Sequence, residues 1–164
     1  SKSLEEAVVD MLKEQGMTLS LAESCTGGAI AARIVNVSGA SEVFLQGMVT
    51  YSNKAKRRSL DVSKSTLKKH GAVSEECAAE MAKGGRKASK TDICLSVTGI
   101  AGPGGGTKEK PVGTVFMGCS YKGCTQVREF HFQGNRARVR EQTVAHGLAF
   151  LRDCMMERAD KQDK

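Results

Sequence analysis

The chain contains no tryptophan, and aromatic side chains make up only 4% of its 164 residues. It also has no apolar run that approaches the roughly 18 residues needed to cross a membrane as a helix. The N-terminus lacks the succession of charged, apolar and small residues that is typical of a signal peptide. These absences predict a soluble, cytoplasmic protein that does not contact a membrane.

Cysteines are present but are not paired at short spacing. The six stand at positions 25, 77, 94, 119, 124 and 154, and no two of them form a C-x-x-C motif. Zinc sites usually show closely spaced ligands, and disulfide frameworks usually belong to smaller secreted domains. We therefore expect reduced thiols within the core, with no metal ion and no cofactor.

Positive charge is in excess, with a formal net charge of +7 and a pI near 9.2. Such an excess is a feature of many nucleic-acid-binding proteins. Here the basic residues are scattered over 54–69, 83–90 and 136–140, and the few aromatics provide no motif for stacking on bases. The composition therefore disfavours a nucleic-acid partner, and a basic surface that attracts anionic nucleotides explains the charge equally well.

Helical and strand patterns alternate along the chain, which is long enough to form one core. The expected strands are 17–22, 44–50, 92–97, 112–121 and 126–132. The expected helices are a first one with an apolar stripe from Leu4 to Leu12 that packs on the sheet, then 29–35, 54–60, 63–70, 74–87 and 136–157, with a frayed tail after Arg158. Ser3 would cap the first helix and Ser74 would cap the helix 74–87. This order predicts a single domain over residues 1–164 with an α/β fold, a three-layer α/β/α sandwich with a mixed β-sheet.

The most informative segment is Ala22-Glu23-Ser24-Cys25-Thr26-Gly27-Gly28, where a predicted strand turns into a predicted helix. Ser24 would lie near the N-terminus of that helix. Unpaired N–H groups and the helix dipole there favour a phosphate or a developing oxyanion. Taken alone, the segment favours an ordinary helix cap by Ser24 or Thr26.

Two further segments also follow predicted strands. One is Val49-Thr50-Tyr51-Ser52-Asn53-Lys54-Ala55-Lys56, and the other is Ser96-Val97-Thr98-Gly99-Ile100-Ala101-Gly102-Pro103-Gly104-Gly105-Gly106. The glycines of the latter would let the backbone approach a ligand and present N–H groups to it, although a flexible surface loop is the alternative. Because loops at strand ends collect at one edge of such a sheet, the three segments could converge.

Together the three segments resemble one family, the amidohydrolase domain found at the C-terminus of the competence/damage-inducible protein CinA and as free-standing nicotinamide-nucleotide amidase. The resemblance runs from Thr18 to about Leu151 and includes Gly71-Ala72-Val73-Ser74, Lys110-Pro111-Val112-Gly113-Thr114-Val115, and Gly134-Asn135-Arg136 followed by Val139-Arg140. It implies the sandwich fold and hydrolysis of the carboxamide of nicotinamide mononucleotide (NMN) to nicotinic acid mononucleotide and ammonia, a step of pyridine nucleotide (NAD) recycling. A non-catalytic nucleotide-binding or interaction domain of the same fold is the main alternative.

The resemblance implies a Ser-Lys dyad. Ser24 is the nucleophile that forms an acyl-enzyme and Lys56 is its general base, whereas Lys54 falls on a variable position. A base lysine must be neutral, so its pKa has to fall from about 10.4 to about 7–8. Lys56 must then be buried, and Arg57 and Arg58 could add repulsion.

Other positions receive supporting roles from the same resemblance. Tyr51 and Thr98 would orient the dyad or bind substrate. Arg136 and Arg140, four residues apart on one helical face, could clamp the 5′-phosphate, with surface ion pairs as the alternative. N–H groups from Cys25 to Gly28 would form the oxyanion hole. The remaining supporting residues are Thr26, Gly27, Gly28, Gly99 and Gly102.

Cys25 is the rival nucleophile, because a thiolate is stronger than a hydroxyl and a helix N-terminus would lower its pKa. The resemblance favours Ser24, and Cys25 then becomes a buried structural thiol. Asn135 departs from the aspartate common in the family, which exchanges one N-cap residue for another. The sequence leaves open the oligomeric state, a homo-oligomer included, and the preference among NMN, nicotinamide riboside and NAD.

Overall fold

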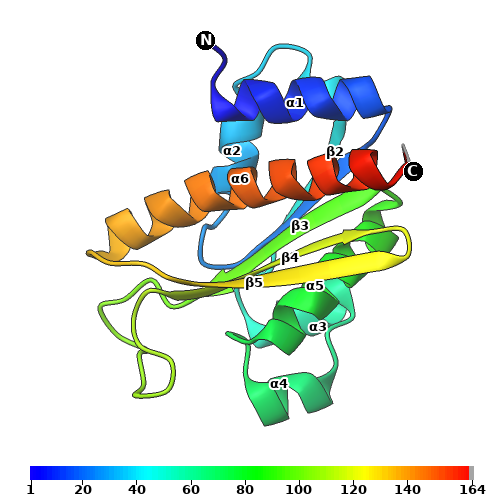
Figure 1. The fold of residues 1–164 in the computed structure, drawn as a ribbon. Coiled ribbons are helices and arrows are strands. Elements are labelled where there is room, and N and C mark those ends of the chain that lie inside the picture. Colours follow the sequence, from blue (N-terminus) through cyan, green and yellow to red (C-terminus); the bar gives the residue numbers. More distant parts are fainter. Residues whose placement is uncertain (163–164) are drawn as a thin grey trace.

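The computed structural model describes residues 1–162, in which five strands form one sheet with helices on both faces (Figure 1). The strands are β1 (Leu19–Glu23), β2 (Phe44–Val49), β3 (Ile93–Gly99), β4 (Thr114–Tyr121) and β5 (Cys124–His131). The helices are α1 (Leu4–Gln15), α2 (Ala29–Val35), the short 3-10 helix η1 (Ala40–Glu42), α3 (Asn53–Leu60), α4 (Lys64–His70), α5 (Glu75–Ser89) and α6 (Arg136–Gln162). The helices α1, α2 and α6 lie on one side of the sheet and α3, α4 and α5 on the other, which confirms the predicted α/β/α sandwich.

The sheet is mixed, with the strand order β2-β1-β3-β4-β5. β2, β1 and β3 run parallel, whereas β4 pairs antiparallel with both β3 and β5. β2 and β3, which follow β1 in the chain, therefore lie on opposite sides of it in the sheet. In such a sheet the carboxyl ends of the parallel strands border a crevice that commonly holds a ligand.

Alternate residues of the central strands face the two helical layers, as the period of a strand requires. Leu21 of β1 and Leu95 of β3 belong to a large hydrophobic cluster with residues of α1, α2 and α6. Ala22 follows Leu21 in β1 and Cys94 precedes Leu95 in β3, and both belong to a second cluster with residues of α3 and α5. Even-numbered side chains at the carboxyl ends of these strands therefore lie on the side of α3 and α5.

Polar side chains cap most of the longer helices. The Oγ atoms of Ser3, Ser52, Ser63 and Ser74 each accept an N–H three residues further on, at the starts of α1, α3, α4 and α5. Asn135 Oδ1 accepts an N–H in the same way at the start of α6. The caps predicted at positions 3, 74 and 135 are thus confirmed.

The packing of α1 differs from the prediction. This helix packs mainly on α6, which lies between α1 and the antiparallel strands, and to a smaller extent on α2 (Figure 1). Its buried residues share a hydrophobic cluster with β1 and β3. Gln15 Nε2 donates to the carbonyl of Met155, and Arg158 donates to Gln15 Oε1. With this support α6 continues to Gln162, past the point where we expected fraying. The rest of the predicted tail, residues 163–164, lies outside the described residues.

β4 begins at Thr114, two residues later than predicted. Gly113 has a positive φ of 96°, which interrupts the extended backbone before the strand. A Cβ atom at Gly113 would lie 2.0 Å from the carbonyl oxygen of Phe132. The close approach of these two segments therefore requires glycine and fixes where the strand starts.

The long helix α6 spans 27 residues but is not apolar enough to cross a membrane. None of the other helices within residues 1–162 meets the requirement either.

The contact between α3 and α5 also depends on a glycine, because a Cβ at Gly84 would lie 1.7 Å from the carbonyl oxygen of Leu60. We expect Gly84→Ala to lower the free energy of unfolding by about 3 kcal/mol or more, since backbone atoms would have to move apart. Denaturant unfolding followed by circular dichroism measures this change. Gly104→Ala is the control, because a Cβ there meets nothing within 4 Å. Equal stability of the two variants would contradict the close approach.

Candidate active site

The three segments singled out in the sequence meet at the carboxyl ends of β1, β2 and β3, around a cavity of about 280 Å³. The cavity is lined by Ser24, Cys25, Tyr51, Asn53, Lys56, Ala72, Val73, Thr98, Gly99, Ile100, Ala101, Gly102, Gly104, Gly105 and Arg136. Of the residues with predicted roles it brings together Ser24, Lys56, Tyr51, Thr98, Gly99, Gly102 and Arg136. Thr26, Gly27, Gly28 and Arg140 are not among the lining residues. The first three continue the turn that carries Ser24, and Arg140 donates to the carbonyl of Thr26.

Lys56 and Ser24 are in direct contact at the wall of this cavity. Lys56 Nζ lies 2.9 Å from Ser24 Oγ, which joins residues 32 positions apart in the chain. The lysine comes from α3, and only 1% of its surface is exposed. Lys54, two residues earlier on the same helix, is exposed to solvent. The fold thus buries the lysine that the role of base requires.

Burial lowers the pKa of Lys56 below the ordinary lysine value, because surroundings of low polarity disfavour the ammonium form. Cys77 and Cys25 act weakly in the opposite direction. Arg57 and Arg58, which we expected to add repulsion, are exposed side chains and are not among the causes of the shift. Desolvation is therefore the physical reason for the lowered pKa.

The hydrogen bonds of Lys56 suit a neutral amine. Besides Ser24 Oγ, its Nζ contacts the carbonyl oxygen of Thr50 at 2.9 Å and that of Tyr51 at 3.3 Å. A neutral amine has two N–H donors and one lone pair. An ammonium would donate to all three oxygen atoms, whereas in the neutral form the two carbonyls take both donors and the lone pair is left for the hydroxyl proton of Ser24.

The N-terminus of α2 is not open to a ligand, contrary to the prediction for this turn. The carboxylate of Glu23, with 1% of the residue exposed, accepts the N–H groups of Gly28, Ile30 and Ala31 at 3.0–3.2 Å. It also accepts the hydroxyl of Thr26 at 2.5 Å. The carboxylate of the chain itself therefore occupies the positive end of the helix dipole.

This arrangement narrows the choice of oxyanion donors near Ser24. The N–H of Gly27 donates to the carbonyl of Ser24 at 3.0 Å, and that of Gly28 donates to Glu23. Both glycines have a positive φ, which lets the chain fold back at this point. The N–H groups of Cys25 and Thr26 are left as the candidates.

The two arginines of α6 divide into separate roles. Arg140 donates from Nε to the carbonyl of Cys25 at 3.0 Å and from a terminal nitrogen to the carbonyl of Thr26 at 2.9 Å. It therefore holds the Ser24 loop from behind. Arg136 lines the cavity and donates to the carbonyl of Gly102 at 2.8 Å and to the hydroxyl of Tyr51 at 3.0 Å. Of the two arginines predicted to clamp a phosphate, Arg136 alone lines the described cavity.

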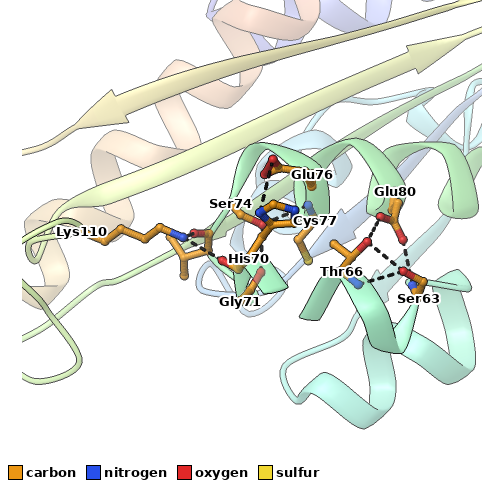
Figure 2. A network of polar contacts seen from close by, with 10 residues as sticks. Ser63, Thr66, His70, Gly71, Ser74, Glu76, Cys77, Glu80 and Lys110 are labelled. Atoms are coloured by element: carbon orange, nitrogen blue, oxygen red, sulfur yellow. Dashed lines mark hydrogen bonds and ion pairs between the residues drawn. The ribbon is translucent and has the colours of Figure 1, made fainter. Parts of the chain in front are cut away.

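Another wall of the cavity is formed by the segment between α4 and α5. Thr98 is only 1% exposed, and its Oγ1 donates to the carbonyl of Ala72 at 2.9 Å. The glycine-rich loop is the connection between β3 and β4, residues 100–113. From this loop Lys110 donates to the carbonyls of His70 and Val73 at 2.8 and 2.6 Å (Figure 2). These bonds join the α4–α5 segment to β3 and to the glycine-rich loop.

Close packing requires glycine at Gly99, the last residue of β3, and at Gly102 in the loop that follows. A Cβ at Gly99 would lie 2.6 Å from Val115, and one at Gly102 would lie 2.4 Å from Val112. Gly102 also has a positive φ of 81°. The close approach of Gly99 to β4 and of Gly102 to Val112 shows that the loop is packed at its base and is not simply a flexible surface loop.

The environment of Cys25 differs from that of a reactive thiol. Burial raises its pKa to about 11, an effect larger than the opposing influence of Arg140 and Lys56. The thiol is therefore protonated at neutral pH, whereas nucleophilic cysteines depend on the thiolate. Since Glu23 occupies the helix N-terminus, the dipole that we expected to lower this pKa is already compensated.

Sequence reasoning missed Glu23 and Lys110. Glu23 had a detectable signal, because it continues the alternation of Leu19 and Leu21 and so falls at an inward position of β1. For Lys110 no local pattern indicates its acceptors, which belong to a segment 37 or more positions away. In residues 1–162 no group of three or more His, Cys, Asp or Glu side chains could hold a metal ion.

Comparison with protein families and curated sequences gives a consistent match. The model of the CinA C-terminal domain matches residues 1–155. A CinA-like protein of Kosmotoga olearia is 52% identical over 155 residues, which cover 94% of this chain and 38% of that protein. A putative competence-damage inducible protein of Clostridium perfringens strain SM101 is 54% identical over 150 residues, which cover 92% and 36%. The chain therefore spans little more than a third of the length of these relatives.

Solved structures agree with the fold. A CinA superfamily protein of Klebsiella pneumoniae superposes with a TM-score of 0.90 at 34% identity, over 95% of this chain and 99% of that one. The competence/damage inducible protein CihA of Agrobacterium tumefaciens gives a TM-score of 0.88 at 40% identity, over 90% and 91%. Sequence and structure thus agree over most of the chain, which belongs to the CinA C-terminal domain family.

Proposed function

We propose that this domain is a nicotinamide-nucleotide amidohydrolase, a hydrolase that cleaves the linear amide C–N bond of the carboxamide of NMN. The observation that carries the proposal is the 2.9 Å contact between Ser24 Oγ and the buried Lys56 Nζ, whose pKa is lowered. The names of the relatives state no reaction, and the chain spans only part of the curated ones. The reaction therefore rests on this site and on the resemblance of its motifs.

In the proposed mechanism Ser24 Oγ attacks the carboxamide carbon while Lys56 accepts the hydroxyl proton. The N–H groups of Cys25 and Thr26 donate to the oxyanion of the tetrahedral intermediate. Lys56 then returns the proton to the departing nitrogen, so that the C–N bond breaks, ammonia leaves and an acyl-serine remains. Water, deprotonated by the same amine, cleaves the ester and regenerates the free hydroxyl.

The cavity suggests how NMN would lie. The carboxamide must reach Ser24, and the only arginine among the described lining residues, Arg136, lies beside Tyr51 and Gly102 at the outer part of the cavity. Tyr51 is 61% exposed, which places its ring at the rim. We therefore place the pyridine ring inside and the 5′-phosphate against Arg136.

Substitution of the dyad tests the proposal directly. We expect Ser24→Ala to lower kcat for ammonia release from NMN by roughly 10⁴-fold or more, and Lys56→Ala to lower it by roughly 10²- to 10⁴-fold. Cys25→Ala should retain activity close to that of the parent chain, because its thiol is protonated at neutral pH. Ammonia release by the purified domain without added metal is the measurement.

The controls separate the outcomes. Circular dichroism shows whether each variant is folded. Activity lost in Cys25→Ala but kept in Ser24→Ala would assign the chemistry to the thiol. A folded parent chain that releases no ammonia would instead favour a nucleotide-binding domain without catalysis.

The pH dependence tests the role of Lys56. A general base acts only when neutral, so kcat/KM should fall as the pH drops through its pKa in the free enzyme. Because burial lowers that pKa, the inflection should lie below the ordinary lysine value of 10.5. Lys56→Arg, which stays protonated, should be inactive at every pH. A profile that is flat on the acid side, or an inflection near 10.5, would exclude Lys56 as the base.

Arg136 should determine the preference for a phosphorylated substrate. We expect Arg136→Met to lower kcat/KM for NMN about tenfold or more and to leave that for nicotinamide riboside nearly unchanged, because a charge-assisted bond to phosphate is lost. Arg138→Met is the matched control, since Arg138 is exposed and pairs with Glu141. Equal hydrolysis of both substrates by the parent chain would show that no phosphate clamp operates.

A further inference from the structure

A second cavity lies at the opposite end of the sheet from the candidate active site. It has a volume of about 560 Å³ and is formed where β1 and β3 begin and where β4 turns into β5. It is lined by Met17, Arg86, Asp92, Tyr121, Lys122, Gly123, Cys124, Arg158 and Lys161. A smaller cavity of about 380 Å³ adjoins it and shares Arg86, Tyr121, Gly123 and Cys124. None of these residues lines the active-site cavity.

Positive charge dominates this region. Arg86, Lys122, Arg158 and Lys161 line the larger cavity, and Lys83 lines the smaller one. Asp92 is the single acidic residue among the described residues that line either cavity. Its carboxylate already accepts the N–H of Thr18 at 2.8 Å and the Thr18 hydroxyl at 3.1 Å. Glu157 of α6 is nearby and accepts a hydrogen bond from Gln126 at 2.7 Å.

Arg86 is the residue whose bonding is incomplete. Its Nε is buried and has no hydrogen-bond partner among the described residues, so a ligand in the cavity would meet the terminal nitrogens of the guanidinium. No ion pair joins this guanidinium to a carboxylate in residues 1–162. Buried donors are nearly always paired, because an unpaired one costs free energy. The planar fork of a guanidinium matches the oxygen atoms of a phosphate group.

The other walls suit the organic part of a ligand. Met17 and Tyr121 line the cavity beside the charged residues, and both side chains are otherwise buried in the core. Burial raises the pKa of Tyr121 to about 12, so its hydroxyl keeps its proton and remains a donor. The volume exceeds what a single inorganic phosphate needs and falls in the range of ordinary small-molecule sites.

We propose that this cavity is a second binding site, which takes a phosphate-bearing small molecule of nucleotide size. Arg86 and Lys122 bind the phosphate, with Lys161 adding positive charge at the rim. Met17 and Tyr121 contact the organic part. The site is independent of the Ser24–Lys56 dyad, because it uses strand ends and loops at the other edge of the sheet.

Titration of the ¹⁵N-labelled chain with adenosine monophosphate, followed by amide chemical shifts, tests the proposal. We expect saturable shifts at residues 121–124 and a dissociation constant about tenfold or more weaker in Arg86→Met, since one charge-assisted bond is lost. Lys122→Met should also weaken binding. Lys122 lies in an exposed turn, so this substitution should leave the fold intact. Lys87→Met is the matched control, because Lys87 is exposed on the same helix and lines neither cavity.

Inorganic phosphate is the second probe, and it should shift the same amides more weakly than adenosine monophosphate. No shift at residues 121–124, or equal affinity of the parent chain and Arg86→Met, would mean that the basic residues hold only solvent counterions and would overturn the proposal. Shifts confined to residues 24–28 and 98–106 would also overturn it and would leave the proposed amidase function intact. The same titration of Ser24→Ala should give unchanged binding at residues 121–124 even if the amidase assay fails.

Discussion

The burial of Lys56 is the constraint on which the rest of the site depends. A protonated lysine in such surroundings destabilises the fold, and its lowered pKa expresses that cost. The cost is complete at a pH below the folded-state pKa and disappears as the pH rises toward the value of an unfolded lysine. Burial of Leu60 and the Ser52 cap anchor α3 at its two ends, so the helix keeps the amine in place.

The same constraint explains why the Ser24 loop is held from two sides. The carboxylate of Glu23 accepts hydrogen bonds from N–H groups at the start of α2, while the guanidinium of Arg140 donates to the carbonyls of Cys25 and Thr26. The carboxylate and the guanidinium thus satisfy the donors and the acceptors of one short turn. A loop fixed in this way keeps the 2.9 Å contact between Ser24 and Lys56 without relying on a ligand. In the proposed reaction, such preorganisation would place the reacting groups before substrate arrives.

The sequence was sufficient for the features that depend on local pattern. Alternating hydrophobicity predicted the five strands, and serine caps predicted helix starts at Ser3 and Ser74. The resemblance of motifs directed attention to Ser24 and Lys56, which the fold brings into contact.

Features that depend on long-range packing could not be predicted in the same way. α1 has an amphipathic pattern that suits a sheet or a helix equally, and only the path of α6 decides between them. Arg136 and Arg140 share a helical face, yet the Ser24 loop contacts one and the cavity contacts the other. The spacing of the two arginines predicts that they share one face of the helix, but it does not predict which segment of the chain packs against each turn of that face.

The arrangement also explains why, in the proposed function, Ser24 and not the adjacent Cys25 would be the nucleophile. A thiolate nucleophile would require a negative charge in the free enzyme, and burial opposes that charge at Cys25. Ser24 and Lys56 can both be neutral before substrate binds, so no buried ion pair has to be maintained.

In the proposed reaction opposite charges arise together, an ammonium at Lys56 and an oxyanion near the N–H groups of Cys25 and Thr26. The carbonyls of Thr50 and Tyr51 already point at the amine and would stabilise the ammonium as it forms. The same carbonyls favour protonation in the free enzyme as well, which burial must outweigh. The depth of Lys56 in the fold therefore sets the balance between an amine that can accept a proton and one that is already protonated.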